Sequence, residues 1–214
     1  MAGPYAGVQV IELGRFIAAP YCGQLLADGG ADVIKVEPLS GDDSRRNGTR
    51  LSATEARQFV NKNRSKRSIA LDLRNPEVQA VVQTLSRDAD VIIANFRPGQ
   101  GAKLGLDYAT LSESNPRLVY AENSAFGLAG PLAGKPGMDA LLQGYAAVAP
   151  MTREGPQIFA DPIVDYTAAM LMAWGIASAL FARERTGNGQ KLDVSLLKLI
   201  GYREKHFLQH HKVM

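Results

Sequence analysis

The chain of 214 residues has one cysteine, Cys22, and three histidines, all of which lie after residue 205. A single cysteine cannot form a disulfide within the chain, and such low usage is typical of proteins of the reducing cytoplasm. No histidine lies near Cys22 in the sequence, so we expect a packing role for its thiol and not a nucleophilic one. These absences predict a cytoplasmic protein without a disulfide framework.

Targeting and membrane signals are also absent. The N-terminal segment has no basic region followed by an apolar run, so no secretory signal is visible. The longest nearly uncharged stretch, Tyr166 to Ala182, is short for a membrane span and contains Thr167, Gly175 and Ser178. We expect it to form a buried helix, and we expect no membrane partner. Hydrophobic residues make up 46% of the chain and charged residues 21%, which favours a globular protein over a disordered one.

The net charge of +3 is unevenly distributed. The basic residues gather in two clusters, which are Arg45, Arg46 and Arg50, and then Lys62, Arg64, Lys66 and Arg67. Each cluster is either a solvated surface or a site for a polyanionic small molecule, because guanidinium and ammonium groups suit phosphates. Interleaved aromatic residues are missing, so we expect no nucleic-acid partner.

Short apolar segments alternate with helical patterns along the chain. The segments expected to be strands are 8–13, 31–36, 68–73, 90–94, 118–123 and 191–195, and the main helical patterns are 19–26, 75–87 and 166–182. Several of the strands are apolar on both faces, as in a parallel sheet that helices cover on both sides. We therefore predict an α/β fold with a Rossmann-like, doubly wound, mostly parallel sheet flanked by helices.

In such a fold, ligands bind beyond the carboxyl ends of the strands, so the loops after the strands are the candidate binding segments. Neither the dinucleotide fingerprint G-x-G-x-x-G nor the phosphate-binding G-x-x-x-x-G-K-[ST] occurs there. A bound nucleotide would need other contacts.

Asp165 lies where a short extended segment enters the long apolar helix. A carboxylate at that place either caps the helix with hydrogen bonds from its first amides, or takes part in chemistry. Its position alone leaves both roles open.

Several segments together resemble the class III CoA-transferases, also called the CaiB/BaiF family. They are VIELGRFIAAP, GADVIKVEP with GDDSR, NRSKRSIALDL, ADVIIANFRPG, NPRLVYAENSAFGLAGP, KPGMDALLQG and ARERTGNGQKLDVSLL, in the family's order between residues 5 and 197. The resemblance implies that Asp165 is the catalytic residue. It also implies that coenzyme A and acyl-CoA are substrates, with no permanently bound cofactor and no metal.

The resemblance also implies a set of CoA contacts. These are Ile17, Ala18, Pro38, Leu71, Asp72, Leu73, Arg74, Asn95, Phe96, Arg97, Lys103, Gly137, Met138 and Asp139. Simple packing is an alternative for Ile17 and Leu71, and helix capping is one for Asp139. Arg97 and Lys103 are the stronger candidates for phosphate contacts.

The chemistry implied for Asp165 is covalent. An aspartate with an ordinary pKa of about 3.9 is ionised at neutral pH and can attack a thioester carbonyl without a base. The product is a mixed anhydride, which released CoA converts to an aspartyl-CoA thioester. The expected function is transfer of CoA between an acyl-CoA and a carboxylic acid.

Three alternatives remain open. The family continues beyond the TGxGQ element into a small second domain and an interlocked homodimer, so this chain could be a truncated, impaired CoA-binding fragment. We expect a large-domain portion over residues 1–199 and an atypical tail over 200–214. An α-methylacyl-CoA racemase needs a histidine where Met138 stands, and methionine cannot carry a proton. The third alternative is a binding or scaffolding module that uses the basic clusters.

Overall fold

A sheet of six parallel strands forms the centre of the computed structural model, which describes residues 2–146 and 148–199. The strands are β1 (Gln9–Glu12), β2 (Asp32–Glu37), β3 (Arg67–Ala70), β4 (Val91–Ala94), β5 (Val119–Ser124) and β8 (Gln190–Ser195). Their spatial order is β3-β2-β1-β4-β5-β8, and every neighbouring pair is parallel. The predicted α/β class is confirmed, with a main sheet that is wholly parallel in the described residues.

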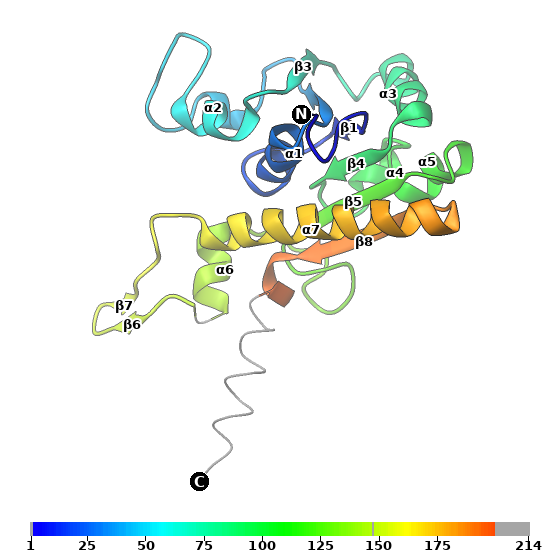
Figure 1. Cartoon of the computed structure of the whole chain (residues 1–214). Coiled ribbons are helices and arrows are strands. Elements are labelled where there is room, and N and C mark those ends of the chain that lie inside the picture. Colours follow the sequence, from blue (N-terminus) through cyan, green and yellow to red (C-terminus); the bar gives the residue numbers. More distant parts are fainter. Residues whose placement is uncertain (1, 147, 200–214) are drawn as a thin grey trace.

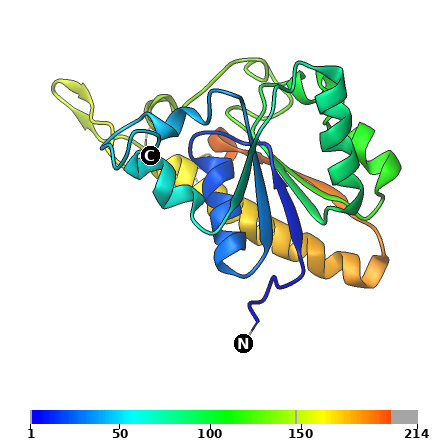
Figure 2. The ribbon, with the colours of Figure 1, turned by 90° about the horizontal axis from the view of Figure 1, so that it is seen from above.

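Helices cover both faces of this sheet (Figures 1 and 2). They are α1 (Ala18–Asp28), α2 (Arg57–Asn63), α3 (Pro76–Asp88), α4 (Gln100–Lys103), α5 (Tyr108–Ser114), α6 (Asp139–Tyr145) and α7 (Ile163–Thr186), with a 3₁₀ turn at Asp43–Arg45. A small antiparallel hairpin of β6 (Met151–Thr152) and β7 (Gly155–Pro156) projects from one end of the molecule in both views.

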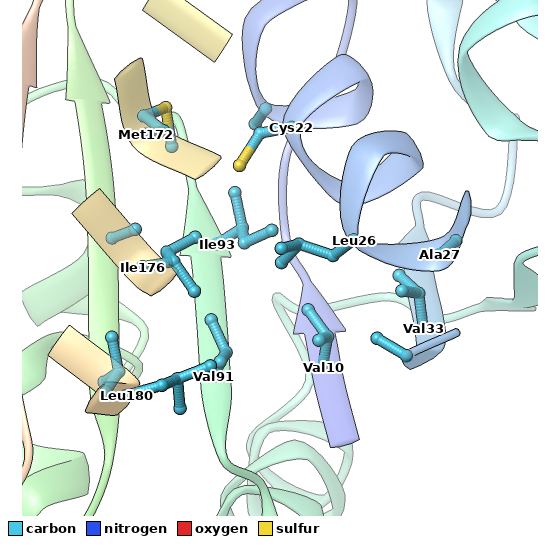
Figure 3. Close-up of a cluster of buried hydrophobic side chains, with 14 of the residues drawn as sticks. Val10, Cys22, Leu26, Ala27, Val33, Val91, Ile93, Met172, Ile176 and Leu180 are labelled. Carbon is cyan, nitrogen blue, oxygen red and sulfur yellow. The ribbon is translucent and has the colours of Figure 1, made fainter. Parts of the chain in front are cut away.

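Alternate residues of the strands face the two helical layers, as the period of two requires. On one face, Val10, Val33, Val91 and Ile93 pack against α1 and α7 (Figure 3). Cys22 belongs to this core, and burial raises the pKa of its thiol, in agreement with the expected packing role.

The opposite residues of the same strands build a second core. Ile11, Ile92 and Tyr120 pack there with Val82 of α3 and Leu111 of α5. The central strands are therefore covered by apolar contacts on both sides, which explains why β4 reads as a continuous apolar run, whereas the edge strand β3 is exposed.

The TGNGQ segment ends α7 and leads into β8. Gly187 follows the last residue of α7 with φ at 76°, a left-handed conformation that glycine adopts without strain. A Cβ at Gly189 would lie 2.1 Å from the carbonyl oxygen of Leu118, so only glycine fits there. The two glycines thus bring β8 beside β5.

Helix α7 is long and apolar enough to cross a membrane by length and composition, a test that core helices of soluble proteins also pass. One side packs in the core through Met172 and Ile176. Met170, Trp174 and Phe181 are exposed on the helix. The expected tail over 200–214 lies outside the described residues.

Candidate active site

The start of α7 is held by a carboxylate from another helix. Asp139, the first residue of α6, is 6% exposed. Its Oδ2 atom accepts hydrogen bonds from the backbone amides of Val164 at 2.8 Å and Asp165 at 2.9 Å, and Gln143 donates to its Oδ1 atom. Asp139 therefore caps a helix, which is the alternative role that the sequence left open for it. The helix that it caps is α7, and not α6, to which it belongs.

Asp165 has a different position from the one expected for a capping residue. It is the third residue of α7, and Pro162 stands at the cap position. The capping interpretation of Asp165 is wrong, because Pro162 holds the cap position and the amides of Val164 and Asp165 donate to the side chain of Asp139. Asp165 is half-buried in the first turn of α7. This end of α7 lies on the side of the sheet where β8 ends (Figure 1).

The surroundings of Asp165 change its acidity. Burial raises the pKa of Asp165 to about 7, the carboxylate of Asp139 adds to the rise, and the ammonium of Lys62 opposes it. A group with this pKa is present in both protonation states at neutral pH. The expectation of an ordinary aspartate pKa is therefore wrong at this position. Shifts of this kind are typical of functional sites, although structural networks also produce them.

An apolar cluster adjoins the start of α7. It joins the beginning of α1, the segment after β5, α6 and α7, and its buried members are Ala18, Phe126, Leu142, Ala146, Val164, Ala168 and Leu196. Ala18, one of the expected CoA contacts, thus lies in the same cluster as Val164, the neighbour of Asp165. The helix turn that carries Asp165 therefore packs against apolar side chains through Val164 and Ala168.

Gly137 and Met138 precede α6 and differ in their surroundings. A Cβ at Gly137 would lie 2.5 Å from the Cβ of Ala125 and 2.8 Å from Cδ2 of Leu142, so no side chain fits there. Met138 is 72% exposed. Of the expected contacts over 137–139, Met138 has the side chain that a ligand could reach.

The loops after β1 and β4 are fastened to each other by Asn95. Its Oδ1 atom accepts a hydrogen bond of 3.0 Å from the backbone amide of Arg15, and its Nδ2 group donates one of 2.8 Å to the Arg15 carbonyl. The next residue, Phe16, has φ at 67°, a strained value for a residue other than glycine. Asn95 therefore fixes the loop that leads to Ile17 and Ala18.

The expected contacts after β3 lie close to those after β2. The backbone amide of Leu71 donates a 2.8 Å hydrogen bond to the carbonyl of Glu37, the residue before Pro38. Leu71 and Leu73 are partly buried against the core, as the packing alternative for Leu71 requires. Arg74 is exposed, and its guanidinium donates two hydrogen bonds to the carboxylate of Asp72, at 2.8 and 2.9 Å. The Arg74 guanidinium holds the pKa of Asp72 at about 2.

Arg97 and Lys103 follow β4 and differ from Arg74 in one respect. Both are exposed, and the structure as described gives neither side chain a hydrogen bond or an ion pair. Phe96, between Asn95 and Arg97, packs against the second core. Arg97 and Lys103 therefore remain available for an anionic ligand.

The first basic cluster lines a cavity of about 410 Å³, whose wall includes Glu37 and Leu39, the neighbours of Pro38 in the sequence, but not Pro38 itself. Arg45 is bonded to Glu37 at 2.6 and 2.7 Å, and Arg46 donates to the carbonyl of Ser40 at 2.6 Å. Arg50 completes the basic lining. The sequence pointed to this cluster by charge alone and did not place it in the site.

The second basic cluster is divided between the interior and the surface, because Lys62 and Lys66 are buried whereas Arg64 and Arg67 pair with Asp28 and Asp32 at the surface. Lys66 and Lys35 both bind the buried carboxylate of Glu12, at 2.7 and 2.8 Å. Lys35 also pairs with Asp42 at 3.0 Å, and Asp42 accepts a hydrogen bond from the amide of Phe16 at 3.4 Å. This network fixes the loops after β1 and β2 relative to each other.

Comparisons with known proteins found a matching family model and several similar proteins. The model of CoA-transferase family III matches residues 5–210. The succinate–glutarate CoA-transferase of Agrobacterium fabrum is 41% identical over 207 residues, with 91% of this chain and 51% of that protein covered. The acetyl-CoA:oxalate CoA-transferase of Acetobacter aceti is 40% identical over 199 residues, with coverages of 91% and 51%.

A solved structure of a CaiB/BaiF family protein from Brucella suis is also similar. It has a TM-score of 0.92 and 36% identity, and the match covers 100% of this chain and 60% of that chain. The chain spans about half the length of the curated relatives that it matches.

Proposed function

Since this chain belongs to CoA-transferase family III, we propose that it moves CoA from an acyl-CoA to a carboxylic acid, with Asp165 as the nucleophile. One observation carries the assignment of Asp165. Its carboxyl group is half-buried in the first turn of α7, beside an apolar cluster, and does not cap the helix. A carboxylate without a structural task in such surroundings is suited to covalent chemistry.

The first half of the reaction removes CoA from the donor. An Asp165 oxygen attacks the thioester carbonyl carbon, the carbon–sulfur bond breaks, and CoA leaves as a thiolate. The products are a mixed anhydride on Asp165 and free CoA. The thiolate then attacks the Asp165 carbonyl carbon, and the donor's carboxylate leaves.

The second half reverses these steps with the acceptor. The acceptor carboxylate attacks the Asp165-CoA thioester, CoA leaves as a thiolate, and a new mixed anhydride forms. The thiolate attacks the acyl carbonyl of the acceptor and releases the Asp165 carboxylate. No proton is transferred in the sequence, so the chemistry needs only the ionised form of Asp165 and a site from which water is excluded.

The proposed CoA path follows the loops after β1, β2, β3 and β4. Ile17 and Ala18 lie after β1, Pro38 after β2, and Arg97 after β4. Arg97 and Lys103 are the proposed phosphate partners because their charges are exposed and unpaired among the described residues. The arginine-lined cavity beside Pro38 adds positive charge to the same edge of the sheet.

Trapping of the covalent intermediate tests the proposal. The full chain is incubated with succinyl-CoA or acetyl-CoA and a carboxylic acid and then treated with hydroxylamine, and peptide mass spectrometry locates any aspartyl hydroxamate. We expect the hydroxamate on Asp165 and none in Asp165→Asn. Asp161→Asn is the matched control, because Asp161 is an exposed carboxylate close to the start of α7. A hydroxamate on another residue, or none with any donor, would contradict the role of Asp165.

A second candidate is CoA binding without turnover. It is supported by the exposed charges of Arg97 and Lys103, which lie on segments other than that of Asp165. Isothermal titration with CoA separates the two candidates, because binding without any trapped hydroxamate favours the second one. The interlocked homodimer implied by the family resemblance is a proposal for the whole protein, and sedimentation of the purified chain measures it.

A further inference from the structure

Lys62 is a buried cation that takes no part in the transfer steps proposed above. It lies in the last turn of α2 and is 3% exposed. Its Nζ atom donates hydrogen bonds to Oε1 of Gln58 at 2.9 Å and to the Gln58 carbonyl at 3.4 Å, both neutral acceptors. No carboxylate of the described residues lies within 4.0 Å of this ammonium. A buried charge without a close counter-charge is costly, so its retention needs a reason.

The position of Lys62 points toward the nucleophile. Its Nζ atom lies 5.5 Å from the ring centroid of Tyr166, the residue that follows Asp165. The ring of Tyr166 in turn packs edge-on against Tyr21 of α1, with centroids 4.9 Å apart. The packing of α1, α2 and the first turn of α7 thus brings the ammonium to the helix turn that carries Asp165, close enough for each charge to act on the other.

Two carboxylates act on Lys62 from a distance. Burial lowers the pKa of the Lys62 ammonium, while Asp165 and Asp42 oppose the change. Asp42 is already paired with Lys35 at 3.0 Å and accepts two hydrogen bonds from Ser44, so its charge is satisfied without Lys62. Asp165 has no such partner in the part of the chain that the structure describes, which leaves it as the counter-charge for Lys62.

The titratable groups near the start of α7 come from four elements, and two of them are charged groups that act on Asp165. Lys62 of α2 favours its ionised form, and the carboxylate of Asp139 of α6 opposes it. The remaining titratable groups at this place are Tyr21 of α1, Tyr166 of α7 and Asp161 before α7. Lys62 is the cation among these groups.

We propose that Lys62 is a positioning residue for the transfer reaction, and that its buried ammonium holds Asp165 in the ionised, nucleophilic form. The inference rests on the proposed role of Asp165. It explains why a lysine is tolerated in the interior beside a carboxyl group that its other neighbours drive toward protonation.

The pH dependence of CoA transfer tests this role. In the full chain, we expect Lys62→Met to move the acid limb of the rate profile up by about one pH unit, because an opposite charge nearby lowers a carboxyl pKa by about 1–3 units. At pH 6 the rate should fall about tenfold, and at pH 9 it should equal the wild-type rate. Lys62→Arg should restore the profile, since it keeps the charge. Arg64→Met is the matched control. Arg64 follows the end of α2, is exposed and pairs with Asp28.

A second measurement tests the role of Lys62 without relying on catalytic turnover or on the variant Lys62→Met. Titration of Asp165, followed by NMR of its isotope-labelled carboxyl carbon and assigned through Asp165→Asn, should show a higher pKa in Lys62→Gln than in the wild type. An acid limb and a carboxyl titration that both stay unchanged on loss of Lys62 would overturn the inference. If the wild type forms no hydroxamate while the titration shifts as expected, the proposed function fails and the electrostatic role of Lys62 stands.

Discussion

The backbone amide of Asp165 donates a hydrogen bond of 2.9 Å to the side chain of Asp139, so two carboxyl groups share the first turn of α7. Asp139 stabilises this helix end, because its charge meets two amides and the positive end of the helix dipole. The same charge raises the pKa of the neighbouring Asp165. Asp139 therefore positions the first turn that carries Asp165 and also lowers the fraction of Asp165 that is ionised.

Removal of the Asp139 charge should separate these two effects. Asparagine at this position keeps an oxygen acceptor for the amides, so Asp139→Asn should move the acid limb of the transfer rate to lower pH. Asp139→Ala loses the cap and should lower the free energy of unfolding by about 1–2 kcal/mol. Urea denaturation and rate profiles of both variants measure the two effects. An acid limb that moves to higher pH in Asp139→Asn would contradict the electrostatic part.

Asp165 should reduce stability at alkaline pH. Its pKa is about 7 in the folded protein and about 3.9 in an unfolded chain, so the folded state holds the proton more strongly. Well below the unfolded pKa, at about pH 3 and lower, both states are protonated and no penalty exists. As the pH rises toward 7 the unfolded state releases its proton first, and the wild type loses stability. We expect Asp165→Asn to be more stable than the wild type by on the order of 2 kcal/mol at pH 8, after allowance for solvent screening, and by no more than about 0.5 kcal/mol at pH 4.

Urea denaturation at the two pH values checks this expectation. Asp161→Asn serves as the control, because its exposed carboxylate should change stability little at either pH. A variant Asp165→Asn that is less stable than the wild type at pH 8 would show that the ionised carboxylate stabilises the fold.

The sheet could be predicted from the sequence because its strands are short apolar runs bounded by glycine and polar residues. Val91 to Ala94 is buried along its whole length, and the expected segment 90–94 contains it. The helix expected from Asn75 begins at Pro76, with the Asn75 side chain accepting a hydrogen bond from the amide of Glu77. Helices α2, α4, α5 and α6 are only four to seven residues long, and such lengths give too few turns for a periodic pattern.

The contacts at the candidate site could not be read in the same way. Asp139 and Asp165 are 26 residues apart, and only the packing of α6 against α7 brings them together. The charge of Lys62 was visible, but its burial depends on the position of α2. The pairing of Arg74 with Asp72 depends on how the chain turns after β3.

Arg97 and Arg74 should contribute unequally to CoA binding. Arg97 has no partner in the described residues, whereas Arg74 already forms two hydrogen bonds with Asp72. A charge-assisted contact to a phosphate is worth about 1.5–3 kcal/mol, so Arg97→Gln should weaken CoA binding at least about tenfold. Arg74→Gln should weaken it much less. Isothermal titration at two salt concentrations measures both, and a larger loss in Arg74→Gln would show that Arg74 leaves Asp72 for the ligand.

Glu12 should be the most sensitive carboxylate of the fold. It is fully buried in β1, and its two oxygens bind Lys35 at 2.8 Å and Lys66 at 2.7 Å. Glu12→Gln leaves two buried ammonium groups without that charge, which should lower the free energy of unfolding by about 3–5 kcal/mol.

The matched control for Glu12 is Asp32→Asn, because Asp32 pairs with Arg67 at the exposed surface. Such a pair contributes about 0–1 kcal/mol. Urea denaturation at neutral pH compares the two variants. Equal losses of unfolding free energy would mean that water reaches the ion pairs of Glu12 with Lys35 and Lys66. Lys35 and Asp42 would then not fix the loop at Phe16.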